Sequence, residues 1–202
     1  YGWTELGIKV APLLLGAMGL TLCYRAKIWN IGAEGQFIMG ALGGSMAALQ
    51  FLDAESRWVL VPILLAGTVS GLLWGALAAW LKTRFNANEI LTTIMLNYIA
   101  LNALLYAVHG PLRDPAGFNF PESAMFADAA LLPLFNEDYR LNVSILFALF
   151  FTVVIWTVMA RSWIGYQIQV LGEDAKAARY AGFNTNRLTW FALLVCGALA
   201  GL

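Results

Sequence analysis

A short polar segment, residues 30–36, separates long apolar stretches of the sequence and contains a carboxylate, two amides and two glycines. Asn30, Glu34 and Gln36 could contact a polar solute, and the glycines favour a bend or a helix start. A carboxylate in hydrocarbon is costly, so Glu34 is expected to face protein or water. Two interpretations stay open: a helix start capped by Asn30, or an irregular segment beside a solute path.

A second polar set lies on one face of an apolar segment. Glu89, Thr93 and Asn97 are four residues apart, so they form one stripe on a helix, and Asn88 lies beside it. A polar stripe on a membrane-spanning helix should point into protein or water rather than lipid. Hydrogen bonding between helices and a solute path lined by this stripe both remain open.

The third polar set, residues 172–182, has acidic residues first, basic residues next and a glycine at its end. This order complements the helix dipole and supplies a C-terminal glycine stop, which predicts a short helix of about two to three turns. Its alanine-rich face is flat and small. Such a helix either connects two spans or docks on a soluble partner.

The sequence contains no recognisable set of residues for covalent or metal chemistry. Histidine occurs once, as His109, and Walker A, Cys/His metal-ligand and Gly-x-Ser-x-Gly patterns are absent. The chain is therefore expected to be no enzyme and to have no catalytic or metal-binding residues. The formal net charge is zero, so nucleic acid is not expected as a partner.

Long apolar segments must position these residues. Hydrophobic residues make up 60% of the sequence and charged residues only 12%, a balance that predicts lipid as the solvent. Spans are expected at about 8–24, 33–52, 58–81, 89–108, 141–160 and 187–202. The predicted fold is all-α, a polytopic transmembrane helical bundle. We expect one domain over residues 1–202, as a fragment of a longer protein truncated at both ends.

The basic residues predict how the bundle is oriented. Eight of the twelve lysines and arginines fall in the connections expected on one side of the membrane, and most acidic residues fall on the other. Residues 161–187 are therefore expected to form a cytoplasmic loop, and residues 109–140 an extracytoplasmic loop that caps the membrane surface.

Small residues recur every four positions in the second and third expected spans. Such strips let two helix backbones approach closely in lipid, and ordinary helix packing is the main interpretation, with a moving gate surface as the alternative. The strips consist of Gly40, Gly44 and Ala48 in one span, and of Gly67, Gly71, Gly75 and Ala79 in the other.

At these polar sets the sequence resembles permease subunits of ABC importers for simple sugars and nucleosides, within the wider ribose and branched-chain amino acid permease superfamily. The resemblance covers nearly the whole chain. The segments that carry it are 29–36, 88–98, 110–121 and 172–182.

The resemblance implies a permease subunit that forms the translocation path of an ATP-driven importer in a bacterial inner membrane. Its implied partners are a cytoplasmic ABC ATPase that holds ATP and Mg, a second, non-identical permease subunit, and an extracytoplasmic substrate-binding protein, with no cofactor on this chain. Residues 161–187 become the coupling loop, with the ATPase contact at Glu173, Ala177, Ala178 and Gly182. Candidates for the path are Asn30, Glu34, Gln36, Asn88, Glu89, Thr93 and Asn97.

Two other functions also fit the residues. A proton-coupled secondary transporter could use Glu34 or Glu89 as an intramembrane proton site, and its uptake would collapse with the proton gradient. A membrane scaffold or sensor would show no solute flux in reconstituted vesicles. The exact substrate, and the choice between a homodimer and a heterodimer, stay open.

Overall fold

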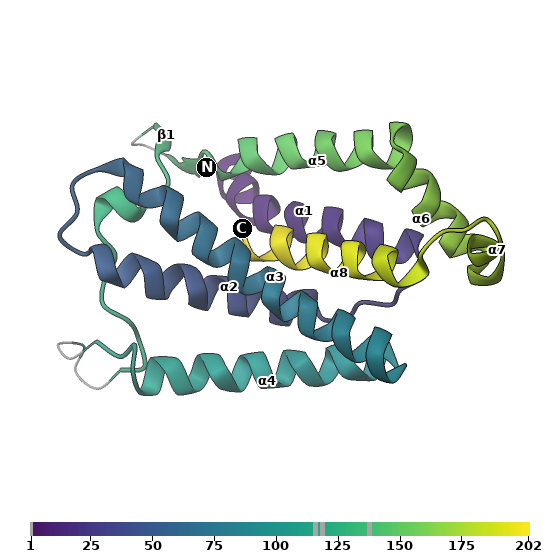
Figure 1. Cartoon of the computed structure of the whole chain (residues 1–202). Coiled ribbons are helices and arrows are strands. Elements are labelled where there is room, and N and C mark those ends of the chain that lie inside the picture. Colours follow the sequence, from purple (N-terminus) through teal and green to yellow (C-terminus); the bar gives the residue numbers. More distant parts are fainter. Residues whose placement is uncertain (1, 115–116, 118–119, 137–138) are drawn as a thin grey trace.

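A computed structural model describes residues 2–114, 117, 120–136 and 139–202 of the chain. In these residues the regular structure is almost entirely helical, with one short hairpin (Figure 1). The α-helices are α1 (Gly2–Arg25), α2 (Ala33–Ala48), α3 (Leu60–Phe85), α4 (Glu89–His109), α5 (Ser144–Arg161), α6 (Trp163–Glu173), α7 (Ala175–Tyr180) and α8 (Thr185–Gly201). Short 3-10 helices are η1 (Leu49–Phe51), η2 (Arg57–Val59) and η3 (Asp128–Ala130), and the strands are β1 (Leu134–Asn136) and β2 (Tyr139–Asn142).

Four helical segments of the described chain are long and apolar enough to cross a membrane: α1, η2 with α3, α4 and α5. The second and sixth expected spans correspond to α2 and α8, which have 16 and 17 residues and pack against α3. The helix α1 starts at Gly2, earlier than expected, and therefore also includes Glu5. The all-α membrane bundle predicted from the sequence is confirmed.

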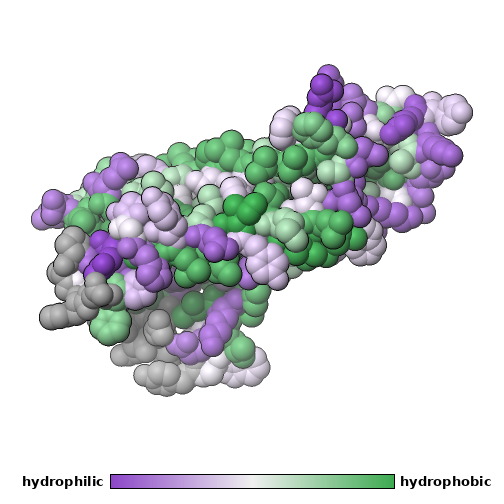
Figure 2. Space-filling model, turned by 90° about the horizontal axis from the view of Figure 1, so that it is seen from below, coloured by the Kyte–Doolittle hydropathy of each residue, from purple (hydrophilic) through white to green (hydrophobic). Residues whose placement is uncertain are grey.

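The helices alternate in direction, so the polar connections collect at two ends of the bundle. In Figure 1 the end of α1, the turn between α3 and α4, and the segment α6–α7 all lie at the same end. We call it the basic end, because Arg25, Lys82, Arg84 and Arg161 lie at helix ends there. Figure 2 shows apolar side chains over the middle of one face, with hydrophilic ones toward both ends, as a membrane-embedded bundle requires.

Side-chain caps start the helices that leave the basic end. Each cap accepts a hydrogen bond from a backbone N–H that has no partner within its helix. The capping residues are Asn88 for α4, Ser162 for α6, Asp174 for α7 and Asn184 for α8. The helix α2 differs, because its first turn follows Gly32 without a side-chain cap.

Glycines bring α3 and α8 into backbone contact, which is the most extensive contact between any two helices of the described chain. A Cβ atom added at Gly71 would overlap the carbonyl oxygen of Gly197, and one added at Gly197 would overlap that of Gly71. A Cβ atom at Gly67 would lie 2.6 Å from the carbonyl oxygen of Gly201. The packing role expected for the glycine strip of the third span is confirmed.

The outer connection between α4 and α5 folds over the end of the bundle opposite the basic end. It contains η3, which contacts η2, and the antiparallel pair of β1 and β2, which the sequence did not predict. Residues 115–116, 118–119 and 137–138 of this expected extracytoplasmic loop lie outside the described residues.

Candidate functional site

Two side chains of α4 hold the backbone of the segment that leads into α2. Asn97 donates from Nδ2 to the carbonyl oxygen of Ile31 at 2.9 Å, and its Oδ1 accepts from the amide of Gly35 at 2.8 Å. Thr93, which is buried, accepts from the amide of Ile31 at 3.2 Å through Oγ1. The first two polar sets of the sequence are therefore one structural unit, joined across two helices.

Asn30 ties the same segment to α8. Its side chain is fully buried, and Oδ1 accepts from the amide of Gly32 at 2.9 Å. Its Nδ2 donates to the Cys196 sulfur at 3.3 Å and to Oε1 of the buried Gln36 at 3.5 Å. Of the two interpretations, the one in which Asn30 caps α2 is wrong, because its side chain closes a turn with Gly32, two residues later, and Gly32 precedes the helix without a side-chain cap.

Of the three polar side chains in this first set, Asn30 and Gln36 are buried and only Glu34 is exposed. It lies in the first turn of α2, where the positive end of the helix dipole favours a carboxylate. The neighbouring side chains of Ile31 and Phe37 are also exposed. Asn30, Gln36 and Thr93 cannot touch a solute in this arrangement, so they position the segment that presents Glu34.

Glu89 forms an ion pair instead of facing open space. Its carboxylate lies 2.8 Å from the ammonium group of Lys82 at the end of α3, and both side chains are about one fifth to one quarter exposed. Asn88 caps α4 by accepting from the amide of Ile90 at 2.9 Å. These two members of the second polar set therefore fix the turn between α3 and α4 at the basic end.

Breaking the ion pair is expected to have a small effect on stability. A double-mutant cycle of Lys82→Met and Glu89→Gln should give a coupling energy of about 0.2–1 kcal/mol, because both groups keep access to solvent. Thermal unfolding in detergent measures this energy, and high salt should lower it. A coupling energy above about 3 kcal/mol would instead indicate a pair that is effectively desolvated.

The segment α6–α7 is built differently from the single helix expected over residues 172–182. The helix α6 extends to Glu173, and Asp174 then leaves helical geometry and caps α7 by accepting from the amide of Lys176 at 2.7 Å. An aspartate is suited to this position because its short carboxylate can accept a hydrogen bond from a nearby backbone N–H, which replaces the helical bonding pattern. The expected helix is therefore two helices joined by a sharp break.

Close contacts fix α6 to two spanning helices. A Cβ atom added at Gly172 would overlap the carbonyl oxygen of Arg25, so α6 lies directly on the end of α1. Gln169 donates from Nε2 to the carbonyl oxygen of Met159 at 3.2 Å, which supplies a partner to the end of α5. A displacement of α6 would therefore move the ends of α1 and α5.

The residues expected at a partner contact divide into exposed and buried ones. Glu173 and Ala177 are exposed, and Gly182 is exposed with φ of +81°, a backbone conformation that glycine adopts without strain. Ala178 is fully buried and packs in the core of this chain. The sequence analysis missed Tyr180, which is 93% exposed on α7, although an aromatic residue in an alanine-rich helix was a usable signal.

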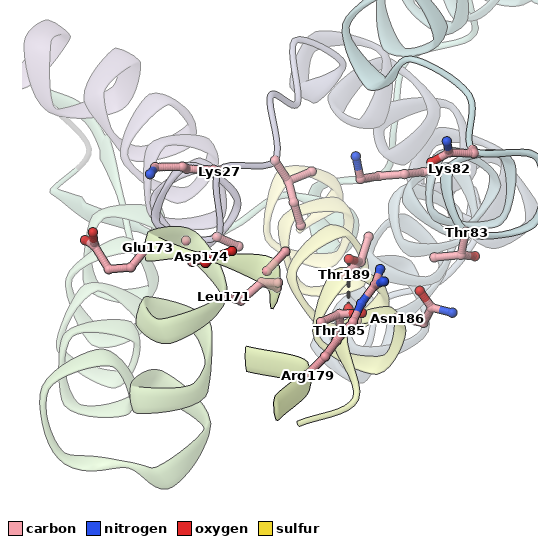
Figure 3. Close-up of a pocket in the computed structure, with 15 residues that line it drawn as sticks. Lys27, Lys82, Thr83, Leu171, Glu173, Asp174, Arg179, Thr185, Asn186 and Thr189 are labelled. Atoms are coloured by element: carbon pink, nitrogen blue, oxygen red, sulfur yellow. Dashed lines mark hydrogen bonds between the residues drawn. The ribbon is translucent and has the colours of Figure 1, made fainter. Parts of the chain in front are cut away.

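A cavity of about 540 Å³ separates α7 from the end of α3 at the basic end (Figure 3). The residues around it come from α3, α6, α7 and α8 and from the connections between helices, and are mostly polar. Labelled among them are Lys27, Lys82, Thr83, Leu171, Glu173, Asp174, Arg179, Thr185, Asn186 and Thr189. The cavity means that α7 is not packed directly against the end of α3, and its buried contact with the core is through Ala178.

Comparisons with known proteins agree with the membrane bundle. Residues 4–202 match the family described as branched-chain amino acid transport system, permease component. The chain is 34% identical to the glucose ABC transporter permease protein TsgB13 of Haloferax volcanii, over 100% of this chain and 55% of that protein. It is 30% identical to the guanosine ABC transporter permease protein NupP of Bacillus subtilis, over 96% of this chain and 56% of that protein.

The nucleoside ABC transporter permease protein NupB of Lactococcus lactis is 26% identical, over 96% of this chain and 55% of that protein. The chain thus spans about half the length of the curated relatives it matches. No solved structure matches it. With its apolar helices, these similarities support a multi-pass protein of the bacterial inner membrane. The chain belongs to the family of permease components of branched-chain amino acid transport systems, which are not themselves enzymes.

Proposed function

We propose that this chain contributes to the translocation path of an ATP-driven ABC importer for nucleosides or simple sugars. The relatives named for glucose, guanosine and nucleosides support this substrate class. Coupling to the ATPase is proposed from the contacts of the segment α6–α7. Gly172 fixes this segment to α1 and Gln169 fixes it to α5, while Tyr180 is exposed to solvent.

The proposed path runs beside the segment that Asn97 and Thr93 hold. This segment carries Glu34 at the surface, its backbone is bound to α4, and the side chain of Asn30 binds it to α8. A shift of α4 or α8 at the basic end would therefore also move Glu34, because hydrogen bonds link both helices to the segment that carries it. Alternating access needs such a two-state bundle and no catalytic residue in this chain.

The proposed partners are those of an ABC importer, and exposure supports a site for one of them. A cytoplasmic ABC ATPase, which holds ATP and Mg, would bind the end of α6 and α7 around Glu173, Ala177 and Tyr180. A second, non-identical permease subunit and an extracytoplasmic substrate-binding protein complete the proposed importer. Ala178 supports α7 from inside, since its side chain is buried.

Proton coupling through Glu89 gains no support from the geometry. A proton carrier must exchange its proton with the path, whereas Glu89 pairs with Lys82 at 2.8 Å at the start of α4. Glu34 is exposed but lies beside the apolar side chains of Ile31 and Phe37. ATP-independent uptake that collapses with the proton gradient would nevertheless overturn the importer proposal.

Substituting Tyr180 tests the docking surface. In the full-length protein, Tyr180→Ala should weaken ATPase binding by about 30-fold or more, since a central interface aromatic contributes about 2 kcal/mol or more. The measurements are ATPase co-purification from mild detergent and uptake of labelled guanosine or glucose into vesicles. Replacing residues 173–182 with a Gly/Ser linker should abolish both.

Tyr106→Ala is the matched control, because Tyr106 is also highly exposed but lies near the opposite end of α4. It should leave ATPase binding unchanged. If the ATPase binds the Tyr180 variant and the linker variant as well as the wild type, then α7 is not its docking site.

A further inference from the structure

Two aromatic side chains at the start of α6 and one from the connection between α7 and α8 form a cluster that the proposed transport mechanism does not use. Trp163 and Tyr166 stack with ring centroids 5.3 Å apart, and Phe183 meets Trp163 edge-on at 5.8 Å. We call these three residues the α6 aromatic cluster. Trp163 is 64% exposed and Tyr166 is 51% exposed, so the cluster presents a large aromatic surface outward.

The cluster lies where a membrane-spanning helix has just ended. The helix α5 has 18 residues, which corresponds to about 27 Å, close to the roughly 30 Å of a hydrocarbon core. Phe150, Val153 and Trp156 are exposed along α5, so its outer face is suited to lipid. Trp163 follows the last residue of α5 by only two positions, which places it at the level of the lipid headgroups.

The orientation of α6 is fixed by contacts on its other side. Gly165, Ile168, Leu171 and Gly172 are buried against the bundle. Ser162 accepts from the amide of Gly165 at 3.0 Å and donates to the carbonyl oxygen of Val158 at 2.6 Å, which locks the bend between α5 and α6. The aromatic surface therefore lies on the side of α6 that faces away from the bundle.

We propose that α6 is an interfacial helix whose aromatic cluster binds the phospholipid headgroup region at the basic end, so that the bilayer sets the position of α7. Tryptophan and tyrosine favour this region because each has an apolar ring and a polar group. Arg161 is exposed at the bend and adds a charge that attracts anionic headgroups. The surface around Tyr180, at the far end of the segment, stays free for a protein partner.

Site-directed spin labels test the depth of the cluster in the full-length protein, reconstituted into vesicles of phosphatidylcholine with phosphatidylglycerol. Cys23 and Cys196 are buried, so unmodified protein provides the background signal. A label at Tyr166→Cys reports on the cluster. A label at Phe150→Cys is the reference for lipid, and a label at Tyr180→Cys is the reference for water. The ratio of oxygen to Ni-EDDA collision should be intermediate at Tyr166, several-fold above that at Tyr180.

A second measurement covers the case in which a labelled variant misfolds. Phospholipids brominated near the headgroup should quench tryptophan fluorescence less in Trp163→Phe than in wild type, whereas deep bromination should quench both equally. A Tyr166 label as accessible to water as the Tyr180 label would overturn the proposal. Shielding of Tyr166 that requires the ATPase would also overturn it, by assigning the cluster to a protein contact.

Discussion

A Gly71→Leu variant is expected to lose its folded bundle. The side chain would have to occupy the space of the Gly197 carbonyl oxygen, and a Cβ atom at Gly71 would also lie 2.8 Å from Cα of Gly201. Backbone cannot yield as a side chain can, so the cost should exceed the roughly 1–3 kcal/mol of ordinary overpacking. Size-exclusion recovery and the thermal unfolding temperature in detergent measure the loss.

Gly16→Leu is the control for this experiment, because no atom lies within 4 Å of a Cβ added at Gly16 in α1. It should purify with an unfolding temperature close to that of wild type. Gly71→Ala should destabilise in the same direction as leucine, by a smaller amount. A Gly71→Leu protein as stable as wild type would mean that α3 and α8 do not cross at these glycines.

Removing the Asn97 side chain is expected to damage both stability and uptake. Asn97→Leu keeps a similar volume but leaves the amide of Gly35 and the carbonyl of Ile31 without their partner. A buried group left unpaired costs about 1–3 kcal/mol, and this cost applies to the amide of the buried Gly35, whereas the bond to the Ile31 carbonyl is exposed and adds less. The free energy of unfolding should therefore fall by about 1–3 kcal/mol. Uptake should fall further than the folded fraction does, because the segment that presents Glu34 loses its attachment to α4.

Asn102→Leu separates this effect from a general loss of a polar residue on α4. Asn102 is exposed, and its Nδ2 donates to the carbonyl oxygen of Tyr98 in its own helix at 2.8 Å. Its substitution should leave unfolding and uptake close to wild type. Equal effects at the two asparagines would remove the argument that hydrogen bonds between helices position the segment. Uptake of labelled guanosine and thermal unfolding should be measured on the same preparations.

Part of the site was predictable because helical periodicity is a local property. The four-residue spacing of Thr93 and Asn97 predicted a polar stripe directed into protein or water, and both side chains bond the segment before α2. The spacing of Gly67, Gly71 and Gly75 predicted a strip for close helix packing. Spacing does not name the partner, and the glycines of α8 became recognisable only when the chain folded.

Other features depend on neighbours that are distant in the sequence. Asn30 lies six residues from Gln36 but 166 from Cys196, and it bonds to both. From the sequence, Glu34 and Ala178 are equally plausible contact residues, yet Glu34 is exposed and Ala178 is buried. The break between α6 and α7 was missed because Asp174 caps α7. A charge pattern alone does not show whether an aspartate lies within a helix or caps the next one.

Lipid as the solvent, the number of apolar segments and the family resemblance could all be read from the sequence, because they depend on composition, length and short motifs. The tertiary structure decided which of the polar residues support the backbone and which reach the surface. It also decided that Tyr180 and the α6 aromatic cluster point outward. The physical reason is that burial and pairing are properties of the space between helices, and that space forms only when α3 and α8 meet at their glycines.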